Sequence, residues 1–238
     1  MSFSGHRRRH SLGQYWINDQ SIVDKIICAA DLKSDDRVLE IGPGRGALTE
    51  KLLDSGVDTL HAIEIDKYLI SGLRNKFLDY PQFSLVEGDV LSVPLTPLEG
   101  LPANKVVANI PYNITGPILQ RTLGRLGHKS ENDFNLLVLL LQKELADRIL
   151  ACAGQSCFSA LTVRIQLLAK CSSVCEVPPY CFTPSPKVHS KVITIKPFRT
   201  VDRFSLKIES KVEQIITAAF LERRKKLRNT LKVFSNLQ

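Results

Sequence analysis

Long apolar segments are missing from this chain of 238 residues. Its longest aliphatic run, Leu136 to Leu141, is far shorter than the roughly 18 residues of a membrane-spanning helix. Met1 to His10 contain no apolar core of the kind that a secretory signal has. We therefore expect a cytoplasmic protein that makes no membrane contact.

Metal-ligand patterns are also missing. The six cysteines form no C-x-x-C pair, and none has a neighbouring histidine at the spacing of metal ligands. Disorder is excluded because 44% hydrophobic and 24% charged residues are the proportions of an ordinary globular protein. We expect reduced thiols, no bound metal and, at this length, one large domain with a small appendage.

Acidic residues are scarce at both ends of the chain, and this scarcity accounts for the whole net charge of +8. Residues 1–10 carry +3 from Arg7, Arg8 and Arg9, and residues 217–238 carry +5. The body between them is formally neutral. Basic ends on a neutral body suggest a polyanion held at the margins of the protein. Two solvated tails are the alternative interpretation.

Short apolar segments alternate with helical patterns along most of the chain. The segments predicted as buried strands are Val38–Ile41, Thr59–Ile65, Phe83–Val86, Lys105–Ala108 and Leu136–Leu141. The segments predicted as helices are Ser21–Ala30, Ala47–Leu53, Tyr68–Leu78, Pro117–Leu126 and Lys143–Leu150. This alternation predicts an α/β fold with a mostly parallel, Rossmann-like sheet that binds ligands at the carboxyl ends of its strands.

The pattern changes toward the end of the chain. Lys187 to Pro197 is predicted as a late strand at an antiparallel edge of the sheet. After Phe198, apolar residues recur at helical spacing from Val212 to Phe234. We therefore expect a catalytic domain at 1–198 and a small basic helical domain at 199–238.

A glycine loop, Gly42-Pro43-Gly44-Arg45-Gly46, lies between a predicted strand and a predicted helix. Glycines at this place let the backbone approach a bound nucleoside closely. The spacing is G-x-G-x-G rather than the G-x-G-x-x-G of dinucleotide folds, which favours S-adenosylmethionine over NAD. Pro43 also removes a backbone donor that a pyrophosphate cradle would use.

Two acidic residues end the next predicted strands and complete a nucleoside site. Glu64 lies 22 residues after Gly42, where a carboxylate can accept both ribose hydroxyls; an ordinary surface glutamate is the alternative. Asp89 could accept a hydrogen bond from an adenine amine, although Gly-Asp is also turn chemistry.

The tetrapeptide Asn109 to Tyr112, Asn-Ile-Pro-Tyr, indicates methyl transfer to an exocyclic base amine. An adenine amine is a poor nucleophile because its lone pair is delocalised into the ring. The side-chain carbonyl of Asn109 and a main-chain carbonyl near Pro111 can each accept one N–H of the adenine amine. They thereby direct the lone pair of the amine at a methyl donor. Tyr112 offers a flat face for stacking. A strand that runs into a proline turn is the alternative.

Taken together, these motifs resemble the ribosomal RNA adenine dimethyltransferases, and in particular the bacterial enzymes that modify two adjacent adenines near the 3′ end of 16S rRNA. The resemblance covers almost the whole chain. The blocks that carry it are Leu12–Gln14, Val38–Thr49, Asn109–Thr115, Gln142–Ile149, Pro178–Lys187 and Phe220–Leu231. It implies a Rossmann-like methyltransferase fold, S-adenosylmethionine as cofactor, 16S rRNA in the small ribosomal subunit as partner, and no metal.

The resemblance also assigns the site. Cofactor contacts fall on Tyr15, Ile17, Gly42, Glu64, Asp89 and Asn109, to which the glycine loop adds Gly44. The catalytic set is Asn109, Pro111 and Tyr112, with Phe182 at the family position that stacks on the flipped base opposite Tyr112. A core phenylalanine in a proline-rich loop is the alternative for Phe182. The basic residues expected to grip rRNA are Arg223, Arg224, Lys225, Lys226 and Arg228, with Arg7 to Arg9.

The chain departs from the family pattern at two places. The family commonly has Asn, Phe and Leu after the Gly-Gln pair, where this chain has Tyr15, Trp16 and Ile17. If the residue at position 15 contacts the cofactor through its main chain, the contact is kept in this chain. A contact through the side-chain amide of the usual Asn would be lost with Tyr15. Family members also usually continue beyond Gln238, so the C-terminal domain is either short or truncated.

Two other functions remain open. A 23S rRNA adenine methyltransferase of the macrolide-resistance type shares the Asn-x-Pro-Tyr loop, although the basic run from Arg223 to Asn229 is more similar to the 16S enzyme. A non-catalytic RNA-binding assembly or transcription factor could use the same scaffold. We expect the catalytic function, a monomer and base extrusion into a pocket between Tyr112 and Phe182.

Overall fold

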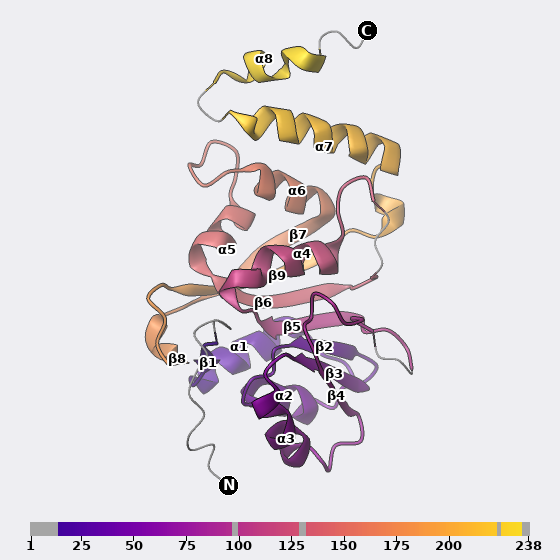
Figure 1. The fold of residues 1–238 in the computed structure, drawn as a ribbon, viewed down its shortest axis with the longest axis vertical. Helices are drawn as coiled ribbons and strands as arrows, with labels where there is room; N and C mark the ends of the chain where they lie inside the picture. The colour runs from indigo at the N-terminus through magenta and orange to yellow at the C-terminus, as the bar shows by residue number, and fades with distance from the viewer. Residues whose placement is uncertain (1–13, 97–99, 129–131, 223–224, 235–238) are drawn as a thin grey trace.

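A seven-stranded sheet forms the centre of the protein (Figure 1). The computed structural model describes residues 14–96, 100–128, 132–222 and 225–234. The strand order is β4-β3-β2-β5-β6-β9-β7; the first five run parallel, and β9 is antiparallel to both its neighbours. The bounds are Arg37–Ile41 (β2), Thr59–Glu64 (β3), Phe83–Glu87 (β4), Lys105–Asn109 (β5), Leu136–Gln142 (β6), Ala169–Val177 (β7) and Ser190–Pro197 (β9).

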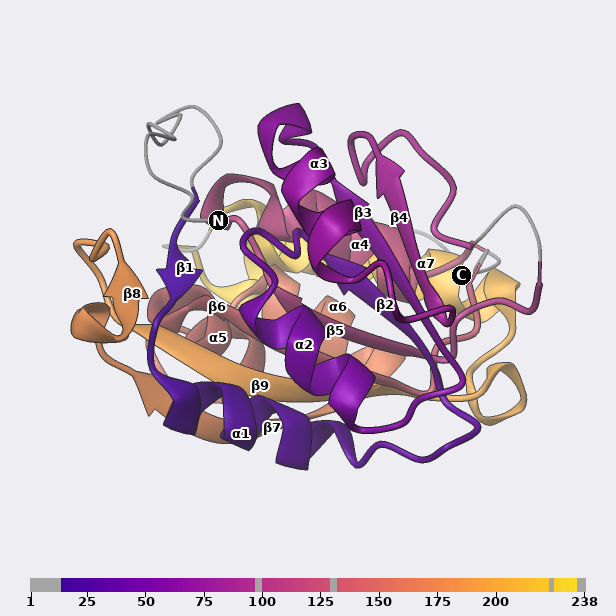
Figure 2. The same cartoon turned by 90° about the horizontal axis from the view of Figure 1, so that it is seen from below.

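Helices cover both faces of this sheet, which confirms the predicted α/β class. Helices α1, α2 and α3 pack on one face, and α4, α5 and α6 pack on the other (Figures 1 and 2). Their bounds are Gln20–Ala30 (α1), Ala47–Asp54 (α2), Lys67–Lys76 (α3), Thr115–Leu123 (α4), Lys143–Leu150 (α5) and Ala160–Leu168 (α6). Five of these six helices lie where helical periodicity predicts them.

The central strands are apolar on both faces because each face is covered by helices. In β6, Leu137, Leu139 and Leu141 belong to the core beneath α4, α5 and α6. The alternate residues Val138 and Leu140 belong to the core beneath α1, α2 and α3. Successive side chains of a strand point to opposite faces, so one continuous apolar run supplies both cores.

The prediction of an antiparallel edge strand near the end of the chain is half right. β9 is antiparallel, but it lies inside the sheet because β7 pairs with its outer side. The true edge, β7, was not predicted. Its sequence is rich in small and polar residues, its side chains are mostly half-buried or exposed, and a bulge interrupts it between Ser173 and Cys175.

A two-stranded ribbon holds the first described segment against a proline-rich loop. β1 (Trp16–Ile17) pairs antiparallel with β8 (Phe182–Thr183), so that Ile17 lies opposite Phe182. The backbone N–H of Asn18 donates to the Cys181 carbonyl at 2.9 Å, and the side-chain Nδ2 of Asn18 donates to Thr183 Oγ1 at 2.8 Å. The 3₁₀ helix η3 (Pro179–Cys181) leads into β8.

Beyond β9, the chain continues onto the outer side of α6. The elements are the 3₁₀ helix η4 (Thr200–Asp202), α7 (Leu206–Leu221), α8 (Leu227–Thr230) and the 3₁₀ helix η5 (Leu231–Phe234). Ile216 of α7 is 5% exposed and joins the core of the α4, α5 and α6 face. Arg203 and Glu209 form a buried ion pair, and Glu209 also accepts the Gly127 N–H at 3.0 Å. The domain division after residue 198 stays a prediction.

None of the helices in the described part of the chain has both the length and the apolar character needed to cross a membrane.

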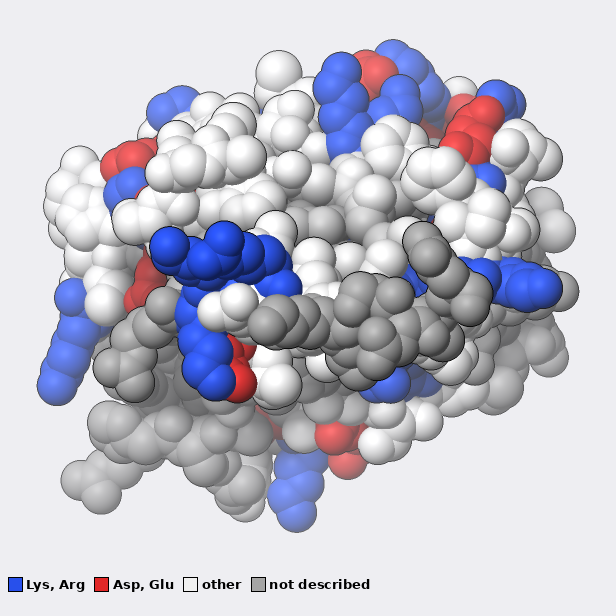
Figure 3. All heavy atoms as spheres, turned by 90° about the horizontal axis from the view of Figure 1, so that it is seen from above, with Lys and Arg blue, Asp and Glu red and all other residues white. Residues whose placement is uncertain are grey.

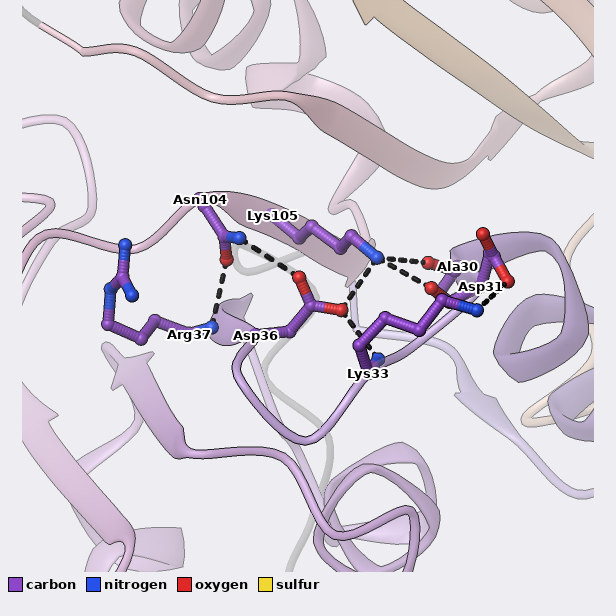
Figure 4. Close-up of polar contacts among 7 residues, drawn as sticks. All are labelled: Ala30, Asp31, Lys33, Asp36, Arg37, Asn104 and Lys105. Atoms are coloured by element: carbon purple, nitrogen blue, oxygen red, sulfur yellow. Dashed lines mark hydrogen bonds and ion pairs between the residues drawn. The ribbon is translucent and has the colours of Figure 1, made fainter.

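A buried charged network closes the end of the sheet where β2 and β5 begin (Figure 4). Lys105 Nζ donates to Asp36 Oδ2 at 2.7 Å and to the carbonyls of Ala30 and Asp31 at 3.0 and 2.7 Å. Asn104 donates to the other Asp36 oxygen at 2.9 Å and accepts the Arg37 N–H at 2.8 Å. Every donor of the ammonium group is used, so this buried charge is fully compensated.

Candidate functional site

The main pocket lies at the opposite end of the sheet, where the parallel strands end. It encloses about 670 Å³ of empty space, part of it open to solvent. Its lining includes eight of the residues expected at the site: Tyr15, Gly42, Gly44, Glu64, Asp89, Asn109, Pro111 and Tyr112. The fold therefore brings together residues that are spread over nearly 100 positions of sequence.

The glycine loop has the backbone shape that only glycine adopts easily. Gly42 and Gly44 have φ angles of +68° and +60°. A Cβ atom on Gly42 would find no atom within 4 Å, so this residue borders open space in the pocket. A Cβ atom on Gly44 would lie 2.8 Å from Trp16 Cδ1, so this residue lets the indole pack against the loop.

Glu64 is buried, with 3% of its surface exposed, at the wall of the pocket. One carboxylate oxygen accepts the Gly44 N–H at 3.0 Å, and the other accepts the Asp66 N–H at 2.8 Å. Burial raises the pKa of Glu64, and these two N–H donors partly oppose that rise. A carboxylate has about four lone-pair positions, so acceptor capacity remains for a ligand hydroxyl.

Asp89 adopts the turn geometry that its sequence also suggested. Its Oδ1 accepts the Leu91 N–H at 2.9 Å, and its carbonyl accepts the N–H groups of Ser92 and Val93. The side chain lines the pocket from the loop after β4. The turn therefore orients the carboxylate while leaving Oδ2 as the oxygen that a ligand amine can reach.

Asn109 is the last residue of β5, and its amide has a defined direction. Nδ2 donates to the main-chain oxygen of Tyr15 at 2.7 Å. Among the described residues, no donor bonds to Oδ1. The amide is thus oriented with its acceptor unused, which is the arrangement needed to accept an N–H from a substrate amine.

The carbonyl of Pro111 is occupied by its own turn. It accepts the Ile114 N–H at 3.2 Å and the Thr115 hydroxyl at 3.3 Å, where η2 (Tyr112–Ile114) leads into α4. The Ile110 carbonyl has no hydrogen-bond donor in the described part of the chain, whereas its N–H donates to Leu140 at 3.0 Å. Of the main-chain oxygens near Pro111, that of Ile110 is the one left for a second amine hydrogen.

Tyr112 is held at its hydroxyl and covered on its ring. The hydroxyl makes a 2.6 Å hydrogen bond with Ser190 Oγ, and Ser190 is completely buried. Burial raises the pKa of Tyr112, so the phenol stays protonated at neutral pH. The ring stacks on Tyr15, with 5.2 Å between ring centroids and 28° between ring planes.

The role of Phe182 as the stacking residue opposite Tyr112 stays a prediction. Phe182 is 3% exposed and belongs to the core beneath α1, α2 and α3, and it does not line the main pocket. Phe182 lies opposite Ile17 in the pairing of β8 with β1. The core-phenylalanine alternative describes its place, and the aromatic residue against Tyr112 is Tyr15.

A second cavity adjoins the main pocket and shares Trp16, Gly42 and Asn109 with it. Ile17 lines this cavity rather than the main pocket. Glu40 also lines it and was not predicted; burial raises its pKa to about 8. An acidic residue inside the apolar run Val38 to Ile41 was the signal that could have identified it. Ser190 left no comparable signal, because a single serine at a strand start has many structural roles.

Only some of the basic residues predicted to bind RNA lie in the described part of the chain. Lys225, Lys226 and Arg228 are exposed, and Lys225 pairs with Glu222 at 2.6 Å. Lys and Arg atoms gather in several groups on the face of the molecule that Figure 3 shows. Arg223, Arg224 and Arg7 to Arg9 lie outside the described residues.

Known proteins with similar sequences are rRNA methyltransferases. The family model for ribosomal RNA adenine dimethylase matches residues 5–238. The ribosomal RNA small subunit methyltransferase A of Prochlorococcus marinus strain SARG is 59% identical over 231 residues, covering 97% of this chain and 83% of the relative. The protein of the same name from Synechococcus sp. strain WH7803 is 58% identical over 233 residues, covering 98% and 83%.

The solved structures of two other enzymes have the same fold. A dimethyladenosine transferase from Plasmodium falciparum has a TM-score of 0.76 and 33% identity, over 91% of this chain and 74% of the other. The 23S rRNA methyltransferase ErmE has a TM-score of 0.74 and 27% identity, over 91% and 83%. These similarities agree with the family resemblance that the sequence motifs carry.

Proposed function

Because the chain belongs to the ribosomal RNA adenine dimethylase family, we propose that it uses S-adenosylmethionine to dimethylate two adjacent adenines near the 3′ end of 16S rRNA. Membership of the family makes the protein an rRNA methyltransferase. The proposal adds the donor, the position of the target and the residues that act. The observation that supports it best is the pair of unused carbonyl oxygens, Asn109 Oδ1 and Ile110 O, beside the pocket.

In this mechanism the two oxygens orient the target amine. Each accepts one N–H of the adenine amine, which draws the nitrogen toward tetrahedral geometry and frees its lone pair. Asn109 can hold this role because its Nδ2 is fixed on Tyr15, so that Oδ1 is the atom presented to the base. No strong base is required, because the amine becomes acidic once it has gained a methyl group.

The donor fits the rest of the pocket. S-adenosylmethionine supplies a methyl group on a positively charged sulfur, which makes that carbon electrophilic. Glu64 and Asp89 offer unused carboxylate lone pairs for ribose hydroxyls and an adenine amine, and Gly42 borders open space where a nucleoside can approach the backbone. Half-buried Trp16 and buried Ile17, which line the adjoining cavity, would extend the site beyond the nucleoside.

The small-subunit target is favoured over the 23S target by sequence similarity. The curated relatives that are 54 to 59% identical all carry the name small subunit methyltransferase A. The 23S enzyme ErmE has only 27% identity at a similar TM-score. A non-catalytic binding role is disfavoured because Glu64, Asp89 and Asn109 are intact and line one pocket.

Binding of the RNA is proposed to use the exposed cations Lys225, Lys226 and Arg228 together with the neighbouring arginines of the C-terminal run. The target adenine would be extruded from its stack and enter the pocket beside Tyr112. A monomer acting in the cytoplasm, as expected from the sequence, is part of the same proposal.

The test is methylation of undermethylated small ribosomal subunits with labelled S-adenosylmethionine, followed by mapping of the modified bases. We expect label on two adjacent adenines near the 3′ end of 16S rRNA and none on large subunits. Label found only on 23S rRNA would show that the protein is instead a 23S rRNA adenine methyltransferase. Absence of measurable S-adenosylmethionine binding by calorimetry would favour the non-catalytic role.

A matched pair of variants tests the residues. Asn109→Ala removes the oriented acceptor and should reduce kcat at least a hundredfold, in line with the loss of one preorganised hydrogen-bonding group. Asn113→Ala changes an exposed asparagine four residues along the same loop and should leave kcat within about twofold of wild type, as exposed substitutions usually do. Equal rates for the two variants would remove Asn109 from the mechanism.

A further inference from the structure

A third cavity, which we call the flanking groove, lies at the same end of the sheet as the main pocket. It is lined by Gln142 at the end of β6, by three charged residues of α5, by Glu176 near the end of β7, and by Val188 and His189 just before β9. It holds about 860 Å³ of empty space, part of it open to solvent. The flanking groove shares no lining residue with the main pocket, so it is a separate site.

The flanking groove begins where Tyr112 is anchored. Gln142 lies directly opposite Ser190 in the pairing of β6 with β9. Residues that lie opposite each other in antiparallel strands have side chains on the same face, with Cβ atoms roughly 4.5 to 5.5 Å apart. Ser190 Oγ in turn bonds the Tyr112 hydroxyl at 2.6 Å. A nucleotide joined by one phosphate to a base beside Tyr112 can therefore reach the flanking groove.

The charges around the flanking groove balance one another. Each carboxylate that lines it is paired with a cation. The pairs are Glu144–Arg148 at 2.7 Å, Asp147–Lys143 at 2.8 Å and Glu176–Lys143 at 2.9 Å, and Lys191 also pairs with Asp147. These side chains therefore leave no surplus positive charge for an RNA phosphate. The groove is suited to a neutral group that forms hydrogen bonds, such as a nucleobase.

The groups left for such a base are an amide and a ring. The side-chain amide of Gln142 makes no hydrogen bond within the part of the chain that the structure describes, although Gln142 is the N-cap residue of α5. A glutamine amide can bond adenine at N6 and N7 together. His189 is exposed and offers a flat ring on which an unstacked RNA base can lie.

We propose that the flanking groove holds the nucleotide next to the target, and that Gln142 recognises its base as adenine while the target lies beside Tyr112. This inference rests on the proposed function, because only a pair of adjacent adenines places a second adenine next to the one being methylated. It makes Gln142 a specificity-determining residue outside the main pocket. The groove lies on one side of Tyr112, so it takes the neighbour on one side of the target only.

The first experiment compares Gln142→Leu and Gln82→Leu with the wild type on undermethylated small subunits. Gln82 precedes β4 at the opposite end of the sheet and is half-buried like Gln142, so it is a matched control. We expect Gln142→Leu to lower kcat/KM for the first methyl transfer roughly five- to hundredfold, as for one lost two-point base contact. Gln82→Leu should stay within about twofold of the wild type. Both should melt and bind S-adenosylmethionine as the wild type does.

The second experiment changes the RNA and needs no variant that could misfold. Small subunits are reconstituted with 7-deazaadenosine, which lacks the N7 acceptor, in place of each target adenine in turn. Single-turnover methyl transfer to the remaining natural adenine is then measured. The wild type should lose rate on one of the two substrates only. Gln142→Leu should show no further loss on that substrate, because its contact to N7 is already absent.

The outcomes separate the inference from the proposed function. Normal methylation by the wild type with no loss on either 7-deazaadenosine substrate would overturn the inference alone. Equal losses on both substrates would do the same, and so would a full further loss in Gln142→Leu. A lower S-adenosylmethionine affinity or melting temperature in Gln142→Leu would give Gln142 a structural role instead. If the wild type does not methylate small subunits at all, the proposed function fails first.

Discussion

The side-chain amide of Asn109 donates to the main-chain oxygen of Tyr15 across 2.7 Å, joining residues that are 94 positions apart in the sequence. The bond joins the end of β5 to the segment that enters β1. It decides which end of the amide faces the pocket, and it uses only the backbone of Tyr15. The side chain at position 15 can therefore vary without loss of the contact that orients Asn109.

Asn109→Asp should abolish this arrangement while keeping the size of the side chain. A carboxylate has no donor for the Tyr15 carbonyl, and the two oxygens repel each other. We expect kcat for small-subunit methylation to fall roughly a hundredfold or more, with S-adenosylmethionine affinity changed much less. Rates close to wild type would show that the orientation of the amide does not matter.

Ser190→Ala tests the anchor of Tyr112. The change leaves a half-buried phenol without its partner, which costs roughly 1 to 3 kcal/mol when the group stays unsatisfied. We expect a several-fold lower kcat. Tyr112→Phe removes the hydroxyl itself, so adding Ser190→Ala to Tyr112→Phe should cost little more. If the losses in kcat of the two single variants add up in the double variant, Ser190 acts on kcat by a route other than its hydrogen bond with Tyr112.

Glu40 should make stability depend on pH. Burial raises its pKa in the folded protein from 4.5 to about 8. Between these values the folded state keeps a proton that the unfolded state has released, so the free energy of unfolding falls as pH rises. Glu40→Gln should flatten this slope between about pH 5.5 and 8.5, as measured by urea denaturation. Glu50→Gln, at an exposed ion pair with Lys76, is the control and should leave the slope unchanged.

Lys105→Met should destabilise the fold without touching the pocket. It removes one partner of a buried pair whose side chains are 11% and 5% exposed, and leaves Asp36 without its cation. The expected loss is about 3 to 5 kcal/mol in the free energy of unfolding. Lys33→Met breaks an exposed pair with Asp31 and should cost less than about 1 kcal/mol. Similar losses in the free energy of unfolding for both variants would mean that the buried pair stabilises the fold no more than the exposed pair does.

Neutralising Lys225, Lys226 and Arg228 with glutamine should weaken RNA binding and reduce its salt dependence. Each lost phosphate contact lowers the slope of log affinity against log salt by roughly 0.7, so three contacts lower it by about 2. Binding to small subunits at several salt concentrations measures this slope. An unchanged slope would remove these residues from the RNA interface, whatever the affinity does.

Much of the fold could be predicted from local patterns. The five parallel strands and five of the six helices on the sheet were predicted because burial on both faces leaves strands such as Leu136 to Leu141 as uninterrupted apolar runs. The edge strand β7 and helix α6 were missed. An edge strand needs few apolar residues, and α6 begins at a capping box on Ser159 but is apolar around most of its circumference, so neither shows a clear period.

The sequence by itself determined the chemistry of this protein: which side chains can accept hydrogen bonds, where glycine permits an unusual backbone, and which segments must be buried. These follow from residue type and short-range spacing. The tertiary structure alone decided that Phe182 is buried, that Tyr15 lies on Tyr112, and that, among the described residues, the Ile110 carbonyl rather than that of Pro111 accepts no hydrogen bond. Such facts depend on contacts between strands that are distant in sequence, and no local pattern encodes them.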